Sequence, residues 1–184
     1  MPTTASNILP LGTLAPDFQL PDMGGKMVAL GDFKSASALA VLFICNHCPY
    51  VKHIQTALAQ LARDYLGRGA AVVAISSNDA KNYPEDSPAN MARVAKAAGY
   101  IFPYLYDESQ AVARAYRAVC TPDIFLFDAS RKLVYRGQFD DSRPGNNIPV
   151  TGESLKEVLN CILDKKPITL IQKPSLGCNI KWKK

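Results

Sequence analysis

The sequence predicts an α/β protein in which helices flank a central mixed β-sheet. An apolar run at residues 38–44 (ALAVLFI) has the length and composition of a strand buried on both faces. An amphipathic helical pattern follows it, and the order of strand then helix is repeated further along the chain. Two later apolar runs flank a turn at residues 128–130 and predict an antiparallel hairpin. The sheet is therefore expected to have a parallel half and an antiparallel half.

A hairpin is predicted before the first central strand, and a helix is predicted after it. Residues 14–33 carry short alternating runs around Gly24-Gly25, which predicts a β-hairpin extension in front of the core. After the strand at residues 38–44, apolar residues recur at spacings of three and four from Pro49 onward. This spacing predicts a helix, and Gly67 is a suitable stop signal.

The remaining elements continue the same alternation. Buried or alternating apolar runs predict strands at residues 71–76, 102–106, 124–127 and 132–136. Helical spacing predicts helices at residues 91–98, 109–116 and from about residue 153 to residue 162. The tail after Pro167 is expected to be extended.

Length and charge limit the possible classes of protein. The chain has 184 residues and is 48% hydrophobic, which is enough for one core without disulfide support. We expect a single domain over residues 1–184, with its core at about 12–163 and a C-terminal tail at about 167–184. The 21 basic and 16 acidic residues are dispersed apart from the basic cluster at residues 181–184, so no nucleic-acid partner is expected. Without a signal-like start or a membrane-length apolar run, we expect a cytoplasmic protein with no membrane partner.

The five cysteines separate into one close pair and three solitary thiols. An odd number in a domain with ample core argues against a disulfide framework. Cys45 and Cys48 form a C-x-x-C motif, whereas the other three are first interpreted as small buried side chains. These three are Cys120, Cys161 and Cys178.

The C-x-x-C motif lies where the buried strand turns into the helix. A helix N-terminus favours a thiolate, and two intervening residues let the second sulfur reach the first. We expect Cys45 to be the nucleophile and Cys48 the resolving cysteine. His47 between them is expected to lower the pKa of the Cys45 thiol. Pro49 suits the first helical turn, where a missing N–H is tolerated.

Half of a zinc site is the other interpretation of this motif. It would require further ligands from among His47, His53, Cys120 and Cys178, and the sequence has no second C-x-x-C. The context of strand, C-x-x-C and helix favours redox chemistry. We therefore expect no metal and no cofactor.

Two further motifs stand beside the cysteine pair. The segment A-P-D-F-x-L occupies residues 15–20, and Thr121-Pro122 immediately precedes the strand at 123–127. With the C-N-H-C-P unit at residues 45–49, the chain resembles the thioredoxin superfamily, specifically the peroxiredoxin-like branch of the AhpC/TSA family. The resemblance spans about residues 12–163 and implies a thioredoxin fold with an N-terminal β-hairpin extension.

The resemblance also implies roles for residues outside the pair. Thr121-Pro122 is similar to the family's cis-proline loop, which would leave the Thr121 backbone open to pair with an extended substrate. Cys120 would then lie beside the pair and is a candidate for a third reactive cysteine. Cys178 is a second candidate because Trp182 could anchor the tail as it folds back over the site. Cys161 lies on the apolar stripe of the last helix, and no redox role is expected for it.

The sequence departs from two family patterns. Peroxiredoxins carry P-x-x-x-T-x-x-C, but the corresponding positions before Cys48 are Val41 and Cys45, so the peroxide-activating threonine is missing. Thioredoxins carry a buried aspartate six residues before the first cysteine, where this chain has Leu39. Proton transfer is then expected to use His47 or the loop at residues 140–143, whose arginine, Arg143, could also hold a thiolate or a carboxylate.

These features predict a thiol–disulfide oxidoreductase that works through Cys45 and Cys48. Its expected partners are protein or small-molecule thiols and disulfides, together with an external thiol reductant. Three alternatives remain open. They are a thiol-dependent peroxidase, a carrier of a soft metal such as copper or zinc on the two thiolates, and a scaffold with inert thiols.

Overall fold

The structure is a computed structural model that describes residues 3–7 and 9–184; residues 1, 2 and 8 of the predicted domain lie outside the described residues. The strands are β1 (Thr3–Ala5), β2 (Gln19–Pro21), β3 (Met27–Ala29), β4 (Ala38–Phe43), β5 (Ala70–Ser76), β6 (Tyr104–Tyr106), β7 (Cys120–Thr121), β8 (Asp123–Asp128), β9 (Leu133–Gly137) and β10 (Leu176–Asn179). The helices are α1 (Pro49–Leu66), α2 (Pro88–Ala98), α3 (Ala111–Ala115) and α4 (Glu153–Leu163), with 3-10 helices η1 (Leu30–Phe33) and η2 (Pro84–Asp86).

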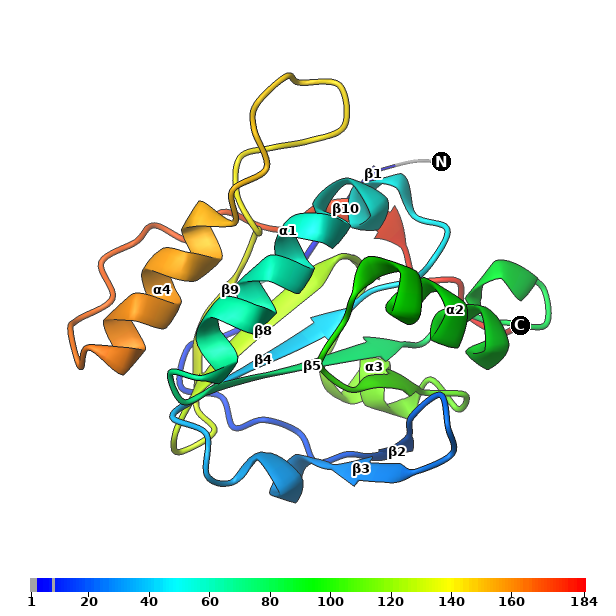
Figure 1. The fold of residues 1–184 in the computed structure, drawn as a ribbon, viewed down its shortest axis with the longest axis horizontal. Helices are drawn as coiled ribbons and strands as arrows, with labels where there is room; N and C mark the ends of the chain where they lie inside the picture. The colour runs from blue at the N-terminus through cyan, green and yellow to red at the C-terminus, as the bar shows by residue number, and fades with distance from the viewer. Residues whose placement is uncertain (1–2, 8) are drawn as a thin grey trace.

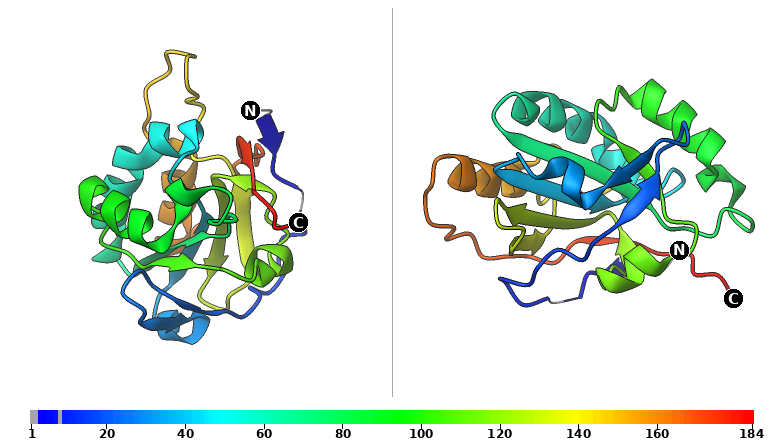
Figure 2. Two further views of the ribbon diagram at one scale, coloured as in Figure 1. Left: turned by 90° about the vertical axis from the view of Figure 1, so that its right-hand side faces the viewer. Right: turned by 90° about the horizontal axis from the view of Figure 1, so that it is seen from below.

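A five-stranded mixed sheet forms the centre of the molecule (Figure 1). Its order is β6-β5-β4-β8-β9, and β4 joins the halves by pairing in parallel with β5 and antiparallel with β8. Helices α1, α2 and α4 lie on one face, while α3 and the β2–β3 hairpin lie on the other (Figures 1 and 2). The predicted mixed sheet flanked by helices, with its N-terminal hairpin, is confirmed.

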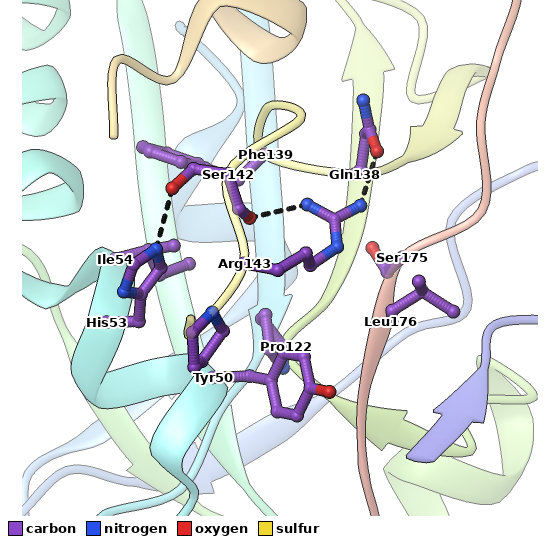
Figure 3. Close-up of a pocket in the computed structure, with 11 residues that line it drawn as sticks. Tyr50, His53, Ile54, Pro122, Gln138, Phe139, Ser142, Arg143, Ser175 and Leu176 are labelled. Atoms are coloured by element: carbon purple, nitrogen blue, oxygen red, sulfur yellow. Dashed lines mark hydrogen bonds between the residues drawn. The ribbon is translucent and has the colours of Figure 1, made fainter. Parts of the chain in front are cut away.

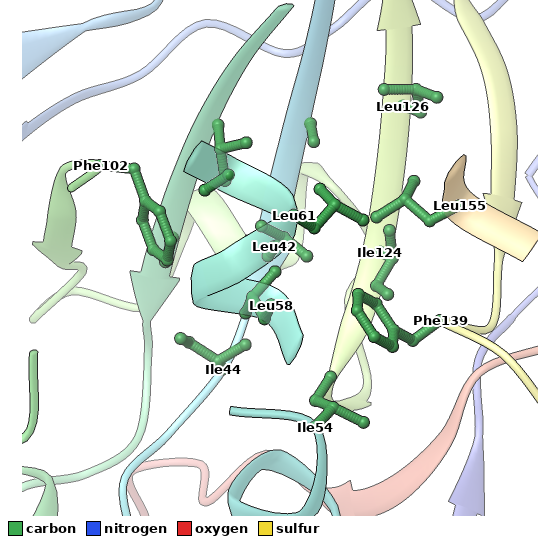
Figure 4. Packing of buried hydrophobic residues seen from close by; sticks show 14 of the residues in the cluster. Leu42, Ile44, Ile54, Leu58, Leu61, Phe102, Ile124, Leu126, Phe139 and Leu155 are labelled. Atoms are coloured by element: carbon green, nitrogen blue, oxygen red, sulfur yellow. The ribbon is translucent and has the colours of Figure 1, made fainter. Parts of the chain in front are cut away.

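The alternation of side chains along β4 explains why this strand has no polar face. Successive residues point to opposite sides of a sheet, so Ala40 and Leu42 enter the core beneath α1 and α4. Val41 and Phe43 enter the second core, between the sheet and α3. Figure 4 shows the first of these cores, where side chains of α1 interlock with those of β4 and β8. A continuous apolar run is what a strand covered on both faces requires.

Helix α1 is held on the sheet by the predicted apolar stripe, and its buried residues include Val51, Ile54, Leu58, Leu61 and Tyr65. Burying each large aliphatic side chain contributes about 1.5–3 kcal/mol. The stripe therefore fixes the orientation of the helix, and with it the position of the helix N-terminus at the end of β4.

The C-terminal tail returns to the sheet edge and forms a second, three-stranded sheet in the order β1-β10-β7. Figure 2 shows the red C-terminal strand beside the blue N-terminal strand. Trp182 lies under the Arg114 guanidinium, 4.5 Å from the ring centroid. The expectation that the tail is extended, folds back and is anchored by Trp182 agrees with this arrangement. Among the described residues, no helix is long and apolar enough to cross a membrane.

Candidate functional site

The two cysteines of the C-x-x-C motif flank the junction between β4 and α1. Cys48 is the N-cap residue of α1, and Pro49 occupies the first helical position, where no N–H is needed. Cys45 follows β4 by two residues, at the end of the most buried strand of the sheet. Both side chains are buried, with 2% of Cys45 and 0% of Cys48 exposed, and all five cysteines are thiols in the structure.

Thr121 contacts both sulfurs. Its Oγ1 lies 3.3 Å from Cys45 Sγ, and its carbonyl oxygen lies 3.1 Å from Cys48 Sγ. The bond between Thr121 and Pro122 is cis, as the resemblance implies. Thr121, the last residue of β7, therefore contacts both members of the cysteine pair.

The surroundings of the two sulfurs favour the thiolate on Cys48. A hydrogen bond from Cys45, which outweighs the cost of burial, lowers the pKa of Cys48, and contacts from Cys178 and the Val51 N–H add to the effect. The same hydrogen bond raises the pKa of Cys45, and burial and the negative charge of Asp86 raise it further. The Thr121 carbonyl oxygen, 3.1 Å from Cys48 Sγ, accepts a hydrogen bond from the Cys48 thiol and therefore opposes its ionisation. In this dithiol arrangement Cys45 is the donor and Cys48 the acceptor of the hydrogen bond, so the pKa of Cys45 is raised. Which of the two cysteines is the nucleophile stays a prediction.

His47 interacts with Asp86 rather than with a sulfur. Its Nδ1 lies 2.6 Å from Asp86 Oδ2, and this hydrogen bond raises the pKa of the imidazole. The ring stacks on Tyr83 with centroids 5.6 Å apart, and Nε2 is buried without a hydrogen-bond partner among residues 3–7 and 9–184. The negative charge of Asp86 raises the pKa of Cys45. The expected effect of His47 on the Cys45 thiol stays a prediction.

Asp86, at the end of η2, is a site residue that sequence reasoning missed. Its fully buried carboxylate accepts hydrogen bonds from the Asn46 backbone N–H at 2.7 Å, from the His47 ring and from Asn78 Nδ2 at 2.7 Å. Burial alone would raise its pKa, but the bonds from His47 and Asn78 outweigh burial and lower it. A buried carboxylate therefore lies beside the cysteine loop although position 39 is a leucine.

The other residue between the cysteines is also fixed. Asn46 Nδ2 donates to the Glu85 carbonyl at 2.8 Å, and Asn46 Oδ1 accepts from the Tyr104 hydroxyl at 3.1 Å. The loop at residues 45–48 is therefore bound to η2 and β6 by both of its central residues. No local signal in the turn-rich segment at 78–88 distinguishes the acid that does this from its neighbours.

The C-terminal strand brings a third thiol to the pair. In the antiparallel pairing of β10 with β7, Cys178 stands opposite Thr121. Its side chain and its backbone N–H both interact with Cys48 Sγ. The expectation that the Thr121 backbone is open to a substrate is therefore wrong for this structure, since β10 occupies that edge.

Of the two other solitary cysteines, Cys120 lies near Cys48 and Cys178, whose charges contribute to its raised pKa, whereas Cys161 lies on α4. Cys120 is fully buried, donates to the Pro122 carbonyl at 3.5 Å, and has a pKa raised first by burial and then by the charge of Asp123. It lies next to Thr121 in the chain but is held as a thiol. Cys161 is half-buried on α4, as its place on the apolar stripe predicted.

Ser142 and Arg143, from the loop at residues 140–143, line a pocket that Pro122 also lines (Figure 3). Arg143 donates to Gln138 Oε1 and to the carbonyls of Asp140 and Ser142. Its guanidinium is thus bound within the loop rather than to a cysteine sulfur. His53, which the sequence offered as a metal ligand, lies 2.7 Å from Ser142 Oγ through its Nε2 and lines the same pocket.

The structure also offers a group of three potential metal ligands. One donor atom each from Cys45, His47 and Asp86 lie within 4.8 Å of one another. This set differs from the ligands considered from sequence, because it includes a carboxylate and only one sulfur of the C-x-x-C pair.

Comparison with solved structures shows two very similar chains. One is described as an uncharacterized conserved protein from Geobacillus kaustophilus, with 57% identity over 100% of this chain and 97% of the other, and a TM-score of 0.97. The second is a hypothetical protein from Sinorhizobium meliloti 1021, with 54% identity over 98% of each chain and a TM-score of 0.97.

More distant similarity shows the fold alone. A thiol:disulfide interchange protein of the thioredoxin family from Chlorobium tepidum TLS is 20% identical, with 85% of this chain and 99% of the other covered and a TM-score of 0.65. The search of curated proteins found no match. The profile of the AhpC/TSA family matches residues 11–136, which is more than half of the sequence. With its thioredoxin-like fold, the chain therefore belongs to the AhpC/TSA family.

Proposed function

We propose that the protein is a thiol–disulfide oxidoreductase that exchanges disulfides through Cys45 and Cys48. The observation that carries the proposal is that the two sulfurs lie at the N-terminus of α1 and both contact Thr121. This arrangement holds two thiols together beside a backbone edge, with one of them favoured as a thiolate.

The chemistry begins at Cys48, in the reverse of the order expected from the sequence. The Cys48 thiolate attacks one sulfur of a disulfide, a mixed disulfide forms, and the other substrate sulfur leaves as a thiolate. Cys45 then loses its proton and attacks Cys48 Sγ, which releases the second substrate thiolate and leaves a Cys45–Cys48 disulfide. Two electrons pass from the pair to the substrate, and an external thiol reductant restores the dithiol.

The experiment is a glutathione redox titration with acid quenching, alkylation and mass-spectrometric mapping. The wild-type chain is expected to form and break a Cys45–Cys48 disulfide reversibly. To separate the two sulfurs, C45S/C178S should retain a glutathione adduct on Cys48, whereas C48S/C178S should react far more slowly. C161S is the matched control, since Cys161 is a thiol remote from Thr121. Equal reactivity of the two double variants would overturn the assignment of Cys48.

Stoichiometric hydrogen peroxide separates this proposal from the thiol peroxidase alternative. An oxidoreductase is expected to react with glutathione disulfide faster than with peroxide, because no threonine stands at position 45 to activate peroxide. Rapid formation of a sulfenic acid on Cys48 would favour the peroxidase instead.

A metal-binding function is the second candidate, and the donors of Cys45, His47 and Asp86 favour it. Sulfur, imidazole and carboxylate are all ligands of zinc. Zinc added to the reduced protein in a calorimeter would bind with an affinity that C45S and H47A lower equally. Binding that survives both substitutions would exclude this site.

A further inference from the structure

Strand β10 occupies the position that an extended partner would take at the site. Leu176–Asn179 run antiparallel to β7, with Cys178 opposite Thr121 and Asn179 opposite Cys120. Extended peptides bind folded proteins in this way by adding a strand to an exposed edge. Here the added strand belongs to the same chain, and its cysteine lies where the cysteine of a partner would have to lie.

The close approach of β10 depends on a glycine. A Cβ at position 177 would lie 1.9 Å from the Thr121 carbonyl oxygen and 2.6 Å from its carbonyl carbon. Only a residue without a side chain permits this contact. Gly177 therefore lets β10 lie flat on the cis-proline loop and brings the next residue, Cys178, against Cys48.

Hydrogen bonds fix the strand on both sides of Cys178. Before it, Ser175 Oγ donates to the Gly137 carbonyl at 2.7 Å. After it, the Ile180 N–H donates to the Val119 carbonyl at 3.0 Å, and the Lys181 N–H donates to Asn78 Oδ1 at 2.8 Å. Cys178 is thus held beside the pair by its neighbours rather than by chance proximity of a loose tail.

Thr121 consequently lies next to all three thiols. Thr121 contacts Cys45 through its hydroxyl, contacts Cys48 through its carbonyl oxygen, and stands opposite Cys178 in the sheet. In the dithiol state, burial and the neighbouring Cys48 thiolate raise the pKa of Cys178. The contribution of Cys48 disappears once its sulfur is part of a disulfide, so oxidation of the pair makes Cys178 easier to ionise.

We propose that Cys178 is a third exchange cysteine and the internal disulfide partner of Cys48; this inference rests on the proposed function. The Cys178 thiolate attacks Cys48 Sγ in the Cys45–Cys48 disulfide, a Cys48–Cys178 bond forms, and the Cys45–Cys48 bond breaks. The electron pair leaves on Cys45 Sγ, which takes up the proton that Cys178 lost. No net oxidation occurs, and the new disulfide links the C-terminal strand covalently to the helix N-terminus.

The test replaces Cys45 and measures which thiol then forms a disulfide with Cys48. C45S, C45S/C178S and C45S/C161S are each oxidised with glutathione disulfide, quenched with acid, alkylated and mapped by mass spectrometry. C45S and C45S/C161S are expected to form an intramolecular Cys48–Cys178 disulfide, whereas C45S/C178S is expected to stop at the glutathione adduct on Cys48. In the wild-type chain both the Cys45–Cys48 and Cys48–Cys178 disulfides are expected at equilibrium.

A persistent glutathione adduct on Cys48 of C45S, with Cys178 reduced, would overturn the inference while leaving the proposed function intact. Failure of glutathione to react with Cys48 in any variant would instead contradict the proposed function. Diamide, which couples neighbouring thiols directly, gives a reading that does not depend on glutathione exchange. If diamide yields no Cys48–Cys178 link within single chains of C45S, the inference is wrong.

Discussion

The two sides of the cysteine pair are built on different physical principles. On the η2 side, a buried carboxylate, an imidazole and an amide hold the loop at residues 45–48 by short hydrogen bonds. On the β10 side, backbone pairing and the close contact of Gly177 bring a third thiol against the pair. The first side fixes the shape of the loop, and the second controls what can reach the sulfurs. Substitutions on the two sides should therefore have different consequences.

The largest expected effect follows from removing the buried carboxylate. D86A leaves the Asn46 N–H and the His47 ring without their acceptor, and breaking a buried ion pair typically costs about 3–5 kcal/mol. We expect a loss of about 3 kcal/mol in the free energy of unfolding, measured with urea near neutral pH. Asp164 pairs with Lys166 at the surface, so D164A should change that free energy by less than about 1 kcal/mol. Equal losses in the two variants would show that the η2 side does not fix the loop.

A smaller effect on stability, but a large one on reactivity, is expected on the β10 side. In G177V the new side chain must move away from Thr121, and a cost of about 1–3 kcal/mol would weaken the closing of β10. Alkylation of Cys48 by iodoacetamide should then accelerate roughly ten- to a hundredfold. G31A is the matched control, because a Cβ at Gly31 meets no atom within 4 Å. Unchanged alkylation in G177V would mean that β10 does not shield the pair.

The dependence of alkylation on pH tests which sulfur carries the charge. Because the pKa of Cys48 is lowered, its thiolate persists as the pH falls below the ordinary thiol range, and the rate drops only at the lowered pKa. An ordinary thiol would lose reactivity by about tenfold for each pH unit below its pKa of about 8.5. C45A removes the main hydrogen-bond donor, so its rate should decline at higher pH than that of the wild type. If both proteins show the same dependence of alkylation rate on pH, the hydrogen bond from Cys45 does not lower the pKa of Cys48.

The smallest effect is expected at the end of the tail. R114A removes the cation over Trp182, a contact worth about 0.5–1 kcal/mol at an exposed site. If this contact helps to hold β10 closed, Cys48 should be alkylated roughly two- to fivefold faster than in the wild type. R93A, on α2, serves as a control for loss of an exposed arginine. If Cys48 is alkylated faster in R114A than in G177V, the contact of Arg114 with Trp182 holds β10 closed more strongly than the close approach of Gly177 does.

The sequence predicted the parts of the fold whose signals are local. The apolar run of β4 and the stripe of α1 are periodic over enough residues to identify their elements, and the cysteines were placed at the junction between them. β10 could not be identified in this way, because it has four residues and pairs with β1, more than 170 positions away, as in Thr3 opposite Cys178. Only the tail's extended course and its return to the site were predicted.

The chemistry of the site was less predictable than its location. The negative charge of Asp86 raises the pKa of the sulfur that it faces, whereas a hydrogen-bond donor lowers the pKa of the sulfur that accepts its bond. The packing of η2 against the loop decides which sulfur faces which group. His47 was expected beside Cys45, and it lies there, but its hydrogen bond to Asp86 redirects its charge. Spacing in a sequence shows which residues can meet, not which contacts they make once several are available.

The pairing of β10 on both sides has a consequence for the size of the molecules that the site can serve. β7 covers one hydrogen-bonding edge of β10 and β1 covers the other, so neither edge is open to a further strand. An unfolded polypeptide that binds through its backbone must first displace a strand anchored at both ends. A small disulfide needs room around one sulfur only, so a smaller displacement of β10, with a lower free-energy cost, is enough to admit it. Under the proposed function, the C-terminal strand would therefore favour small disulfides over extended polypeptides as substrates.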